Sequence, residues 1–439
     1  MKKLLLTFAM MLLLVTVVLL VSCGETASTS ETTPAETTPE APAVTTVELT
    51  EKGIPVNKLA EVSALVGTHR FDEEALALMK LVIRDYYDKK GCRVLNENGD
   101  GITLWAVGSF LEAVGTVHKL YPEDEEILSV YKGLLDRGLK SFKVRYSAKK
   151  VNGVLPYYYN SSAGNTGDYY YDDDEWIAIQ YMEAYKTFGD EKYLQYAQEI
   201  LEFVWLGWGI GTKESDNLGM GGIPWKVGTG PLTCSNAPAA YAFATFSTLT
   251  EDKALSEEYL TRSQTVYDWV KEYLRRNGYY YIDGPGNNWS ASYNNGLMLC
   301  SASMLYGITG DKTYFRDAMQ GARTAYSNNL NVTRTHVSFK EDIENEWMDA
   351  WLVKGFVEYY KIDDSNVTTY LDDCCRVMAF SIENKLTEGE WAGYFRDRFD
   401  EGPGANNNGP SKDPTHLGGA VSLVAVLAEW AELYGTNYQ

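Results

Sequence analysis

Two joints in the chain share the same sequence pattern, and this repeat limits the possible folds more than any other feature. The joints read Tyr185-x-x-x-Gly189-Asp190-x-x-Tyr193 and Tyr306-x-x-x-Gly310-Asp311-x-x-Tyr314. Apolar residues recur at helical spacing on both sides of each joint, so that Gly ends one helix and Asp caps the next. Each joint is therefore a tight αα-hairpin, and the chain is predicted to consist of repeated hairpins.

Beyond residue 70 the apolar positions recur mostly at helical spacing, and Gly, Pro and Asn cluster between the periodic segments. This pattern predicts twelve helices, at 71–89, 102–120, 123–145, 172–187, 190–207, 236–250, 255–277, 293–309, 311–329, 345–361, 366–386 and 415–434. Connections after the even-numbered helices are short, whereas connections after the odd-numbered helices are long. One end of the bundle should therefore collect the long loops.

The even-numbered helices also carry less charge than the odd-numbered ones, as a comparison of 236–250 and 415–434 with 190–207 shows. A helix that is apolar all round is buried, while an amphipathic helix faces water on one side. We therefore predict an all-α fold, an (α/α)6 toroid of six inner and six outer helices. Its cleft should lie where the inner N-termini meet the long loops.

The first residues have the order of an export signal. Lys2 and Lys3 precede an apolar run that ends in Leu20-Val21-Ser22-Cys23, which resembles a bacterial lipobox. In that interpretation 1–22 is a lipoprotein signal peptide and Cys23 is the lipid-modified first residue of the mature protein, anchored to the cell envelope at the outer membrane or the cell surface. A retained membrane anchor is the alternative, because the apolar run could barely span a bilayer.

Residues 23–60 are rich in Thr, Pro and Glu, a composition typical of an unfolded tether. The formal charge of −21 opposes binding to nucleic acid, which is not an expected partner. The five cysteines beyond the signal are odd in number and lack metal-ligand spacing, so we expect them to be buried and expect neither a metal site nor a cofactor. The protein is expected to be a monomer.

Only one predicted inner helix begins with adjacent carboxylates among several aromatic rings. It reads Tyr169-Tyr170-Tyr171-Asp172-Asp173-Asp174-Glu175-Trp176. A capping box is the structural alternative, since acidic residues suit a first turn. Glycoside hydrolysis needs two carboxyls, about 5–5.5 Å apart for retention and about 6.5–9.5 Å apart for inversion. Neighbouring Asp side chains can reach the shorter distance, so Asp172 and Asp173 are the predicted catalytic pair of a retaining glycoside hydrolase.

At these residues the chain resembles glycoside hydrolase family 76, the endo-acting α-1,6-mannanases, an (α/α)6 family marked by an Asp pair followed, after two residues, by Trp. The resemblance extends through Gly221-Gly222-Ile223-Pro224-Trp225, Ser235-Asn236-Ala237-Pro238-Ala239 and Ser292-Tyr293-Asn294-Asn295-Gly296. Three features depart from the family pattern: Asn295, where Gln is expected, Pro224, where an aromatic residue is common, and the segment Glu344-Asn345-Glu346-Trp347. The resemblance implies that 61–439 is a catalytic domain acting on a mannan-like polysaccharide or oligosaccharide through a covalent glycosyl-enzyme, with Asp172 as nucleophile and Asp173 as general acid/base.

Rings and amides near the starts of the inner helices are the candidate substrate-binding residues: Trp105, Tyr171, Trp176, Trp225, Asn236, Tyr293, Asn294 and Trp347. Packing of loops and capping of helices are the ordinary alternatives for such residues. Two other functions stay open. One is an (α/α)6 hydrolase of another glycan, such as an unsaturated uronidase, although the long loops are poor in Arg. The other is a surface glycan-binding lipoprotein without catalysis, which needs no paired acids.

Overall fold

The structure of the chain is a computed structural model. It describes residues 64–164, 167–210, 221–286, 288–333, 337–340, 345–364, 367–396 and 411–435. All of these belong to one compact unit, Val47–Gln439. The expected signal peptide, the lipidation site at Cys23 and the tether at 23–60 lie outside the described residues.

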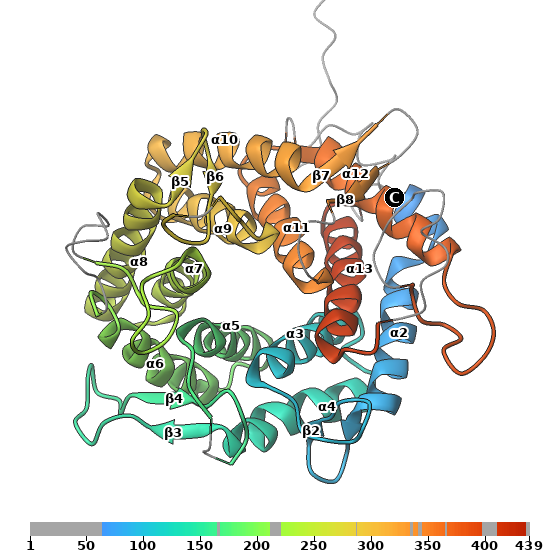
Figure 1. Ribbon diagram of the computed structural model, residues 1–439, viewed down its shortest axis with the longest axis horizontal. Helices are drawn as coiled ribbons and strands as arrows, with labels where there is room; N and C mark the ends of the chain where they lie inside the picture. Colours follow the sequence, from blue (N-terminus) through green and yellow to red (C-terminus); the bar gives the residue numbers. More distant parts are fainter. Residues whose placement is uncertain are drawn as a thin grey trace, which may run out of the picture. The chain divides into compact units, whose positions relative to one another are not determined.

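The twelve predicted helices are present and form two concentric rings (Figure 1). The inner ring consists of α3 (Leu104–Leu120), α5 (Tyr171–Phe188), α7 (Thr233–Leu249), α9 (Ser292–Thr309), α11 (Glu346–Tyr360) and α13 (Pro414–Gly435). The outer ring consists of α2 (Phe71–Tyr86), α4 (Glu125–Asp136), α6 (Glu191–Leu206), α8 (Lys253–Tyr273), α10 (Lys312–Asn329) and α12 (Val367–Glu383). Each inner helix contacts the next, and α13 contacts α3, so the ring is closed and the (α/α)6 prediction is confirmed. A short additional helix, α1, lies at 64–68.

The division into inner and outer helices follows from their sequences. Every residue of α7 from Thr233 to Ser247 is buried, whereas α4 buries a single face. The repeated joints are αα-hairpins, as predicted. Gly189 and Gly310 have φ angles of 65° and 69°, which suit glycine, and the Asp after each glycine accepts a hydrogen bond from a backbone N–H of the next helix.

Four two-stranded antiparallel ribbons lie in the long connections, and the sequence analysis did not predict them. They are β1 (Tyr87–Asp88) with β2 (Arg93–Val94), β3 (Lys143–Arg145) with β4 (Tyr157–Tyr159), β5 (Arg275–Arg276) with β6 (Tyr280–Tyr281), and β7 (Leu330–Val332) with β8 (Val337–Phe339). The helix predicted over 123–145 was too long, because α4 ends at Asp136 and a 3-10 turn, Gly138–Ser141, follows. Lys143 then pairs with Tyr159, and this non-local pairing overrides the local helical pattern.

Two contacts in the inner ring leave no room for a side chain. A Cβ on Gly419 of α13 would lie 2.1 Å from the backbone N of Trp347, and a Cβ on Gly296 of α9 would lie 2.3 Å from the carbonyl O of Trp351. Because Trp347 and Trp351 both belong to α11, this helix packs against its two neighbours backbone to backbone. Glycine is therefore required at both positions.

The inner helix α13 is long and apolar enough to cross a membrane over Pro414–Tyr434, but 78% of its most apolar stretch is buried inside the protein. Its hydrophobicity is that of a core helix. The five cysteines beyond the signal are free and buried, as predicted: Cys92, Cys234, Cys300, Cys374 and Cys375.

Candidate active site

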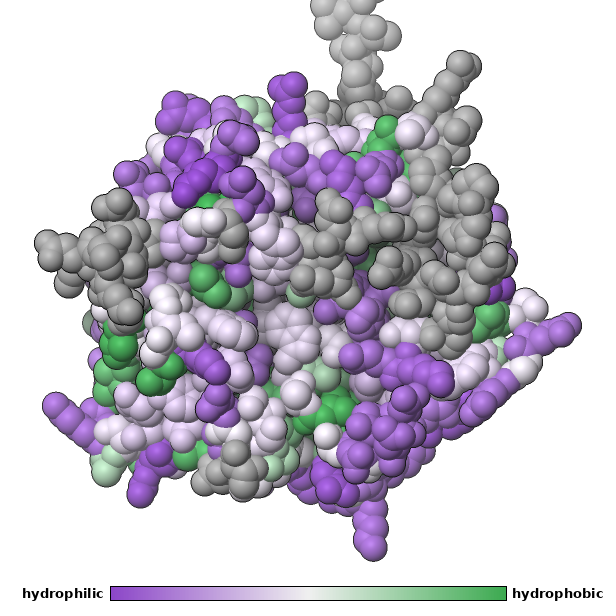
Figure 2. Space-filling view, in the orientation of Figure 1, coloured by the Kyte–Doolittle hydropathy of each residue, from purple (hydrophilic) through white to green (hydrophobic). Residues whose placement is uncertain are grey.

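A cavity of about 530 Å³ opens where the inner helices begin. The described residues that line it are Thr103, Trp105, Ser161, Tyr170, Asp172, Asp173, Trp225, Leu232, Cys234, Asp283, Trp289 and Tyr293. They come from the first turns of α3, α5, α7 and α9 and from the long connections before them. Figure 2 shows this face, with a hollowed centre of intermediate hydropathy over the inner ring and hydrophilic residues around it. The cleft predicted at the long-loop end is therefore present.

The start of α5 supplies two of the three carboxyls among the described lining residues, and Asp283 is the third. Asp172 and Asp173 are 4% and 6% exposed. The backbone N–H of Asp173 donates to Oδ1 of Asp172 at 3.0 Å, and the indole N–H of Trp225 donates to Oδ2 at 3.2 Å. Both oxygens of Asp172 are thus held by donors, which fixes the orientation of its carboxyl group.

Burial sets the protonation of this pair. It raises the pKa of Asp173 to about 7 and raises the pKa of Asp172 well above its ordinary value, to which the neighbouring Asp173 charge adds. No Lys or Arg is among the described residues that line the cavity, so no cation offsets this effect there. The two groups titrate as a pair, and at neutral pH the pair retains a proton.

The next two acids of α5 lie outside the cavity. Asp174 accepts a hydrogen bond from the backbone N–H of Tyr159 at 2.7 Å, which ties β4 to α5. Glu175 is fully buried, and neither carboxyl oxygen has a hydrogen-bond partner among the described residues, so burial raises its pKa well above its ordinary value. The capping-box alternative does not describe this helix start, since the N-cap residue is Tyr170 and makes no side-chain cap.

Three of the predicted sugar-binding rings line the cavity: Trp105, Trp225 and Tyr293. Trp225 is 36% exposed and packs against Tyr170 with ring centroids 4.9 Å apart. Trp176 and Trp347 are each 1% exposed and do not appear among the lining residues. They contact Trp105, with centroid distances of 6.5 and 4.8 Å, and so support the cavity wall from the barrel core.

The other three predicted residues make contacts within the protein and are also not among the lining residues. Tyr171 stacks on Phe203 with ring centroids 4.9 Å apart. The side chain of Asn236 accepts from the backbone N–H of Ile223 and donates to its carbonyl O, both at 2.8 Å, which fixes the segment leading to Trp225. Asn294 donates to Oδ1 of Asp283 at 3.0 Å.

Seven lining residues were not among the predicted site residues: Thr103, Ser161, Tyr170, Leu232, Cys234, Asp283 and Trp289. Asp283 is 8% exposed and its Oδ1 also accepts from the backbone N–H of Cys234 at 3.1 Å. Burial raises its pKa. Asp283 and Trp289 both lie in the long connection before α9, and a search for carboxylates and rings along whole connections would have found them. The described residues contain no group of three or more His, Cys, Asp or Glu placed to hold a metal ion.

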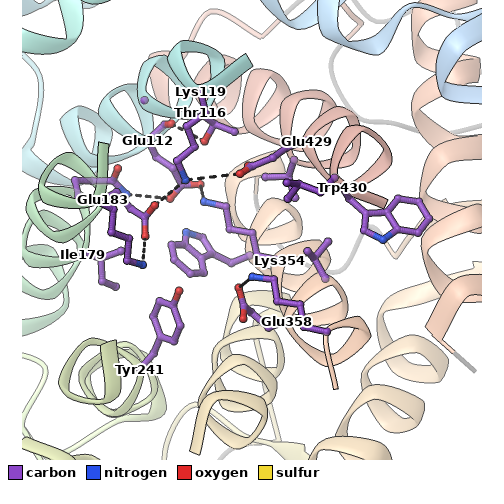
Figure 3. A pocket seen from close by; sticks show the side chains of 18 of the residues that line it. Glu112, Thr116, Lys119, Ile179, Glu183, Tyr241, Lys354, Glu358, Glu429 and Trp430 are labelled. Carbon is purple, nitrogen blue, oxygen red and sulfur yellow. Dashed lines mark hydrogen bonds and ion pairs between the residues drawn. The ribbon is translucent and has the colours of Figure 1, made fainter. Parts of the chain in front are cut away.

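A second cavity, of about 290 Å³, lies at the C-terminal ends of the inner helices (Figure 3). Its charged lining residues are four acids and four bases: Glu112, Glu183, Glu358, Glu429, Lys119, Lys186, Lys354 and Lys361. Lys119 reaches between Glu183, at 2.7 Å, and Glu429, at 4.0 Å. Although burial alone would raise it, the Lys119 and Lys186 charges hold the pKa of Glu183 well below its ordinary value. On α5, Glu183 lies roughly 16 Å from Asp172 along the helix axis.

Comparison with known proteins places these features in context. The sequence model of glycosyl hydrolase family 76 matches residues 73–384. A family 76 glycoside hydrolase from a bovine strain of Bacteroides thetaiotaomicron has a similar structure, with a TM-score of 0.67 and 22% identity over 82% of this chain and 78% of that one. The α-1,6-mannanase of a Salegentibacter species has a TM-score of 0.63 and 21% identity, over 82% and 99% of the two chains.

An inactive variant of the Salegentibacter mannanase has asparagine in place of two consecutive aspartates and was solved in complex with α-1,6-mannotriose. It matches with a TM-score of 0.61 and 20% identity, over 82% of this chain and 99% of that one. At such identities these structures show a shared fold. No curated protein matches this chain.

Proposed function

Because the chain belongs to glycosyl hydrolase family 76, we propose that it is a retaining glycoside hydrolase. Its substrate is α-1,6-linked mannan, which it cleaves at internal linkages of the polysaccharide. The observation that carries the proposal is the adjacent pair Asp172 and Asp173 in the wall of the main cavity. The complex of the Salegentibacter variant with α-1,6-mannotriose supports both the substrate and the use of two consecutive aspartates.

In the first step Asp172 attacks the anomeric carbon while Asp173 gives its proton to the departing glycosidic oxygen. This forms a covalent glycosyl-enzyme and releases one part of the glycan. In the second step Asp173 takes a proton from a water molecule, and the resulting hydroxide displaces Asp172 from the sugar. Two inversions give a product with the same α configuration as the substrate.

The surroundings of the pair favour this assignment of roles. Hydrogen bonds to a carboxylate stabilise its charged form, and Asp172 receives two, from the Asp173 backbone and the Trp225 indole. These two donors oppose the Asp173 charge, which raises the pKa of Asp172 further, and the proposed roles require the single proton to lie on Asp173 when substrate is bound. A pKa of about 7 for Asp173 suits a group that must give a proton and later take one back near neutral pH.

The lining of the cavity favours a neutral sugar. The rings of Trp105, Trp225, Trp289 and Tyr293 offer apolar faces for pyranose units. A uronate carboxylate would enter a cavity whose described lining has acids but no basic residue. This disfavours the uronidase alternative.

The test uses substitutions of the two acids, with Asp174→Asn as the matched control. Asp172→Ala should abolish turnover of every substrate. Asp173→Ala should still form the glycosyl-enzyme from an aryl α-mannoside with an acidic leaving group, which needs no proton, and added azide should restore release of the sugar. Asp174→Asn keeps an oxygen that can accept from Tyr159 and should keep its activity.

Proton NMR of the first products decides the stereochemistry. Early α-anomers are expected. Early β-anomers would contradict both roles, because inversion needs a distant base. Azide rescue of Asp172→Ala instead of Asp173→Ala would reverse the assignment. A protein that binds mannan but does not cleave it would be a glycan-binding lipoprotein without catalysis.

We also propose that Cys23 carries a lipid that holds the domain at the cell envelope. The proposal rests on the lipobox-like Leu20-Val21-Ser22-Cys23 and the Thr- and Pro-rich segment after it. Wild-type protein should partition with membranes, and Cys23→Ala should be soluble or unprocessed. Unchanged fractionation and mass in Cys23→Ala would rule out lipidation at this residue.

A further inference from the structure

Another cavity, distinct from the two described above and lined mostly by polar residues, adjoins the main cavity. This side cavity has a volume of about 330 Å³, and its described lining residues are Tyr280, Asn288, Trp289, Ser290, Ser292, Asn328, Asn329, Lys340 and Asp349. Trp289 also lines the main cavity. A single indole therefore borders both spaces, and the two cavities adjoin at this residue.

Hydrogen bonds within the protein hold the walls of the side cavity. Lys340 donates from Nζ to the carbonyl O of Ser327 at 2.8 Å and from its backbone N–H to the carbonyl O of Asn329 at 2.9 Å. The amide of Asn329 donates to the carbonyl O of Ala325 at 2.8 Å. These bonds join the end of α10 to the segment after β8, so the wall exists before any ligand enters.

Asn295 of α9 organises the opposite wall. Its amide nitrogen donates to Oγ of Ser290 at 2.9 Å, and its Oδ1 accepts from the backbone N–H of Tyr281 at 3.2 Å. At this position the family resemblance leads us to expect Gln, whose longer side chain would displace Ser290 or Tyr281. The departure from the family pattern therefore lies where it shapes the side cavity.

The lining has the chemistry of a carbohydrate site rather than of an ion site. It offers three Asn amides, two Ser hydroxyls, one Lys and one Asp beside the rings of Tyr280 and Trp289. Burial raises the pKa of Asp349 to about 8, so at neutral pH its carboxyl is mostly uncharged and can both donate and accept. Hydroxyl groups of a sugar need such mixed partners, while an ion would find at most one opposite charge.

We propose that the side cavity binds one neutral hexose unit of the glycan whose neighbouring units occupy the main cavity. Its volume is at the lower end of the range for small-molecule sites, which suits a single pyranose ring. The unit belongs either to a branch on the cleaved chain or to the chain itself. This inference rests on the proposed function and extends it, because it makes the side cavity a determinant of which mannans are cleaved.

The test compares Asp349→Ala and Asn328→Ala with the control Asn331→Ala, which alters an exposed residue of β7 outside the lining. Three substrates distinguish a branch unit from a backbone unit. They are a short linear α-1,6-mannooligosaccharide, a long linear α-1,6-mannan, and the same mannan with single mannose branches. If the unit is a branch, kcat/KM on branched mannan should fall about tenfold in both lining variants while both linear substrates change less than twofold. If it is a backbone unit, kcat/KM should fall on both long mannans and not on the short substrate.

Equal kcat/KM for wild type and both lining variants on all three substrates would overturn the inference, and so would an equal loss on all three. Thermal unfolding identifies any variant that fails to fold, and for such a case Asn295→Gln provides a second perturbation of the same wall. If wild type cleaves none of the substrates, the proposed function fails. The side cavity is then tested by calorimetric titration with the two long mannans, where a Kd unchanged in Asp349→Ala overturns it and a Kd raised about tenfold supports it.

Discussion

The two mouths of the barrel use the same kinds of residue in opposite ways. At the mouth where the inner helices begin, Asp172 and Asp173 are buried with no cation among the described residues of the cavity. At the mouth where these helices end, four acids face four lysines. One helix, α5, contributes to both, with Asp172 in its first turn and Glu183 near its end.

The difference shows what a cation does for a carboxyl group in similar surroundings. Burial raises the pKa of Asp173 to about 7, whereas the Lys119 and Lys186 charges outweigh burial and lower the pKa of Glu183. A proton can therefore move on and off Asp173 near neutral pH, while Glu183 stays ionised. The first arrangement suits chemistry, and the second suits stability.

The largest expected effect separates the mouths by activity. Asp172→Asn should lower kcat on α-1,6-mannan by a factor of about 10⁴ or more, since it removes the proposed nucleophile. Glu183→Gln, the matched substitution on the same helix, should leave kcat within twofold. Steady-state kinetics on both variants checks this. Similar losses of kcat in the two variants would contradict the assignment of catalysis to the mouth that contains Asp172.

The next effect separates the mouths by stability and pH. Burial raises the pKa of Glu175, so the folded state keeps a proton that the unfolded chain loses above roughly pH 4.5, and stability declines as pH rises beyond this. Glu183 has a lowered pKa, so its contribution is present above roughly pH 4.5 and is lost as pH falls below it. Glu175→Gln should therefore raise the free energy of unfolding at pH 8 by about 2 kcal/mol, and Glu183→Gln should lower it by about 1–2 kcal/mol.

Urea denaturation at pH 4, 6 and 8 measures both effects. The gain from Glu175→Gln should shrink toward pH 4, and the loss from Glu183→Gln should shrink at still lower pH. If both substitutions destabilise the protein equally at every pH, the contrast between the two mouths is one of packing and not of charge.

The smallest expected effect concerns the donor on Asp172. Trp225→Phe keeps a ring beside Tyr170 but removes the indole N–H that donates to Oδ2 of Asp172. One hydrogen bond to a charged group corresponds to roughly a tenfold decrease in kcat. Trp391→Phe, away from the cavity lining, is the control. An increase in KM with kcat unchanged would assign Trp225 to sugar binding alone.

The helices and their order in the ring could be predicted because both depend on local patterns. Apolar spacing gives each helix, and Gly followed by Asp gives the two repeated joints at 189–190 and 310–311. The ribbons could not be predicted in this way. Each strand has two or three residues and is defined by a partner across a loop, as Lys143 is by Tyr159.

The same distinction between local and non-local signals applies to the residues of the candidate site. Adjacent acids at a helix start are a local signal, and Asp172 and Asp173 do line the cavity. The direction in which a ring points is not local. Trp176 follows the acids by one turn of α5 and lies in the core against α11, while Trp289, which no motif marks, borders two cavities.

Gly296 and Gly419 set how closely α11 packs against its two neighbours in the inner ring. The helix they bring close, α11, stands diametrically across the barrel from α5. Trp176 of α5 spans the interior to Trp347 and Trp351 of α11, at centroid distances of 4.9 and 5.0 Å. Since a closed ring has no free end to absorb a displacement, one methyl group at either glycine would widen the ring and move α11 away from α5. Two positions without side chains thus set the distance between α5 and the helix across the ring.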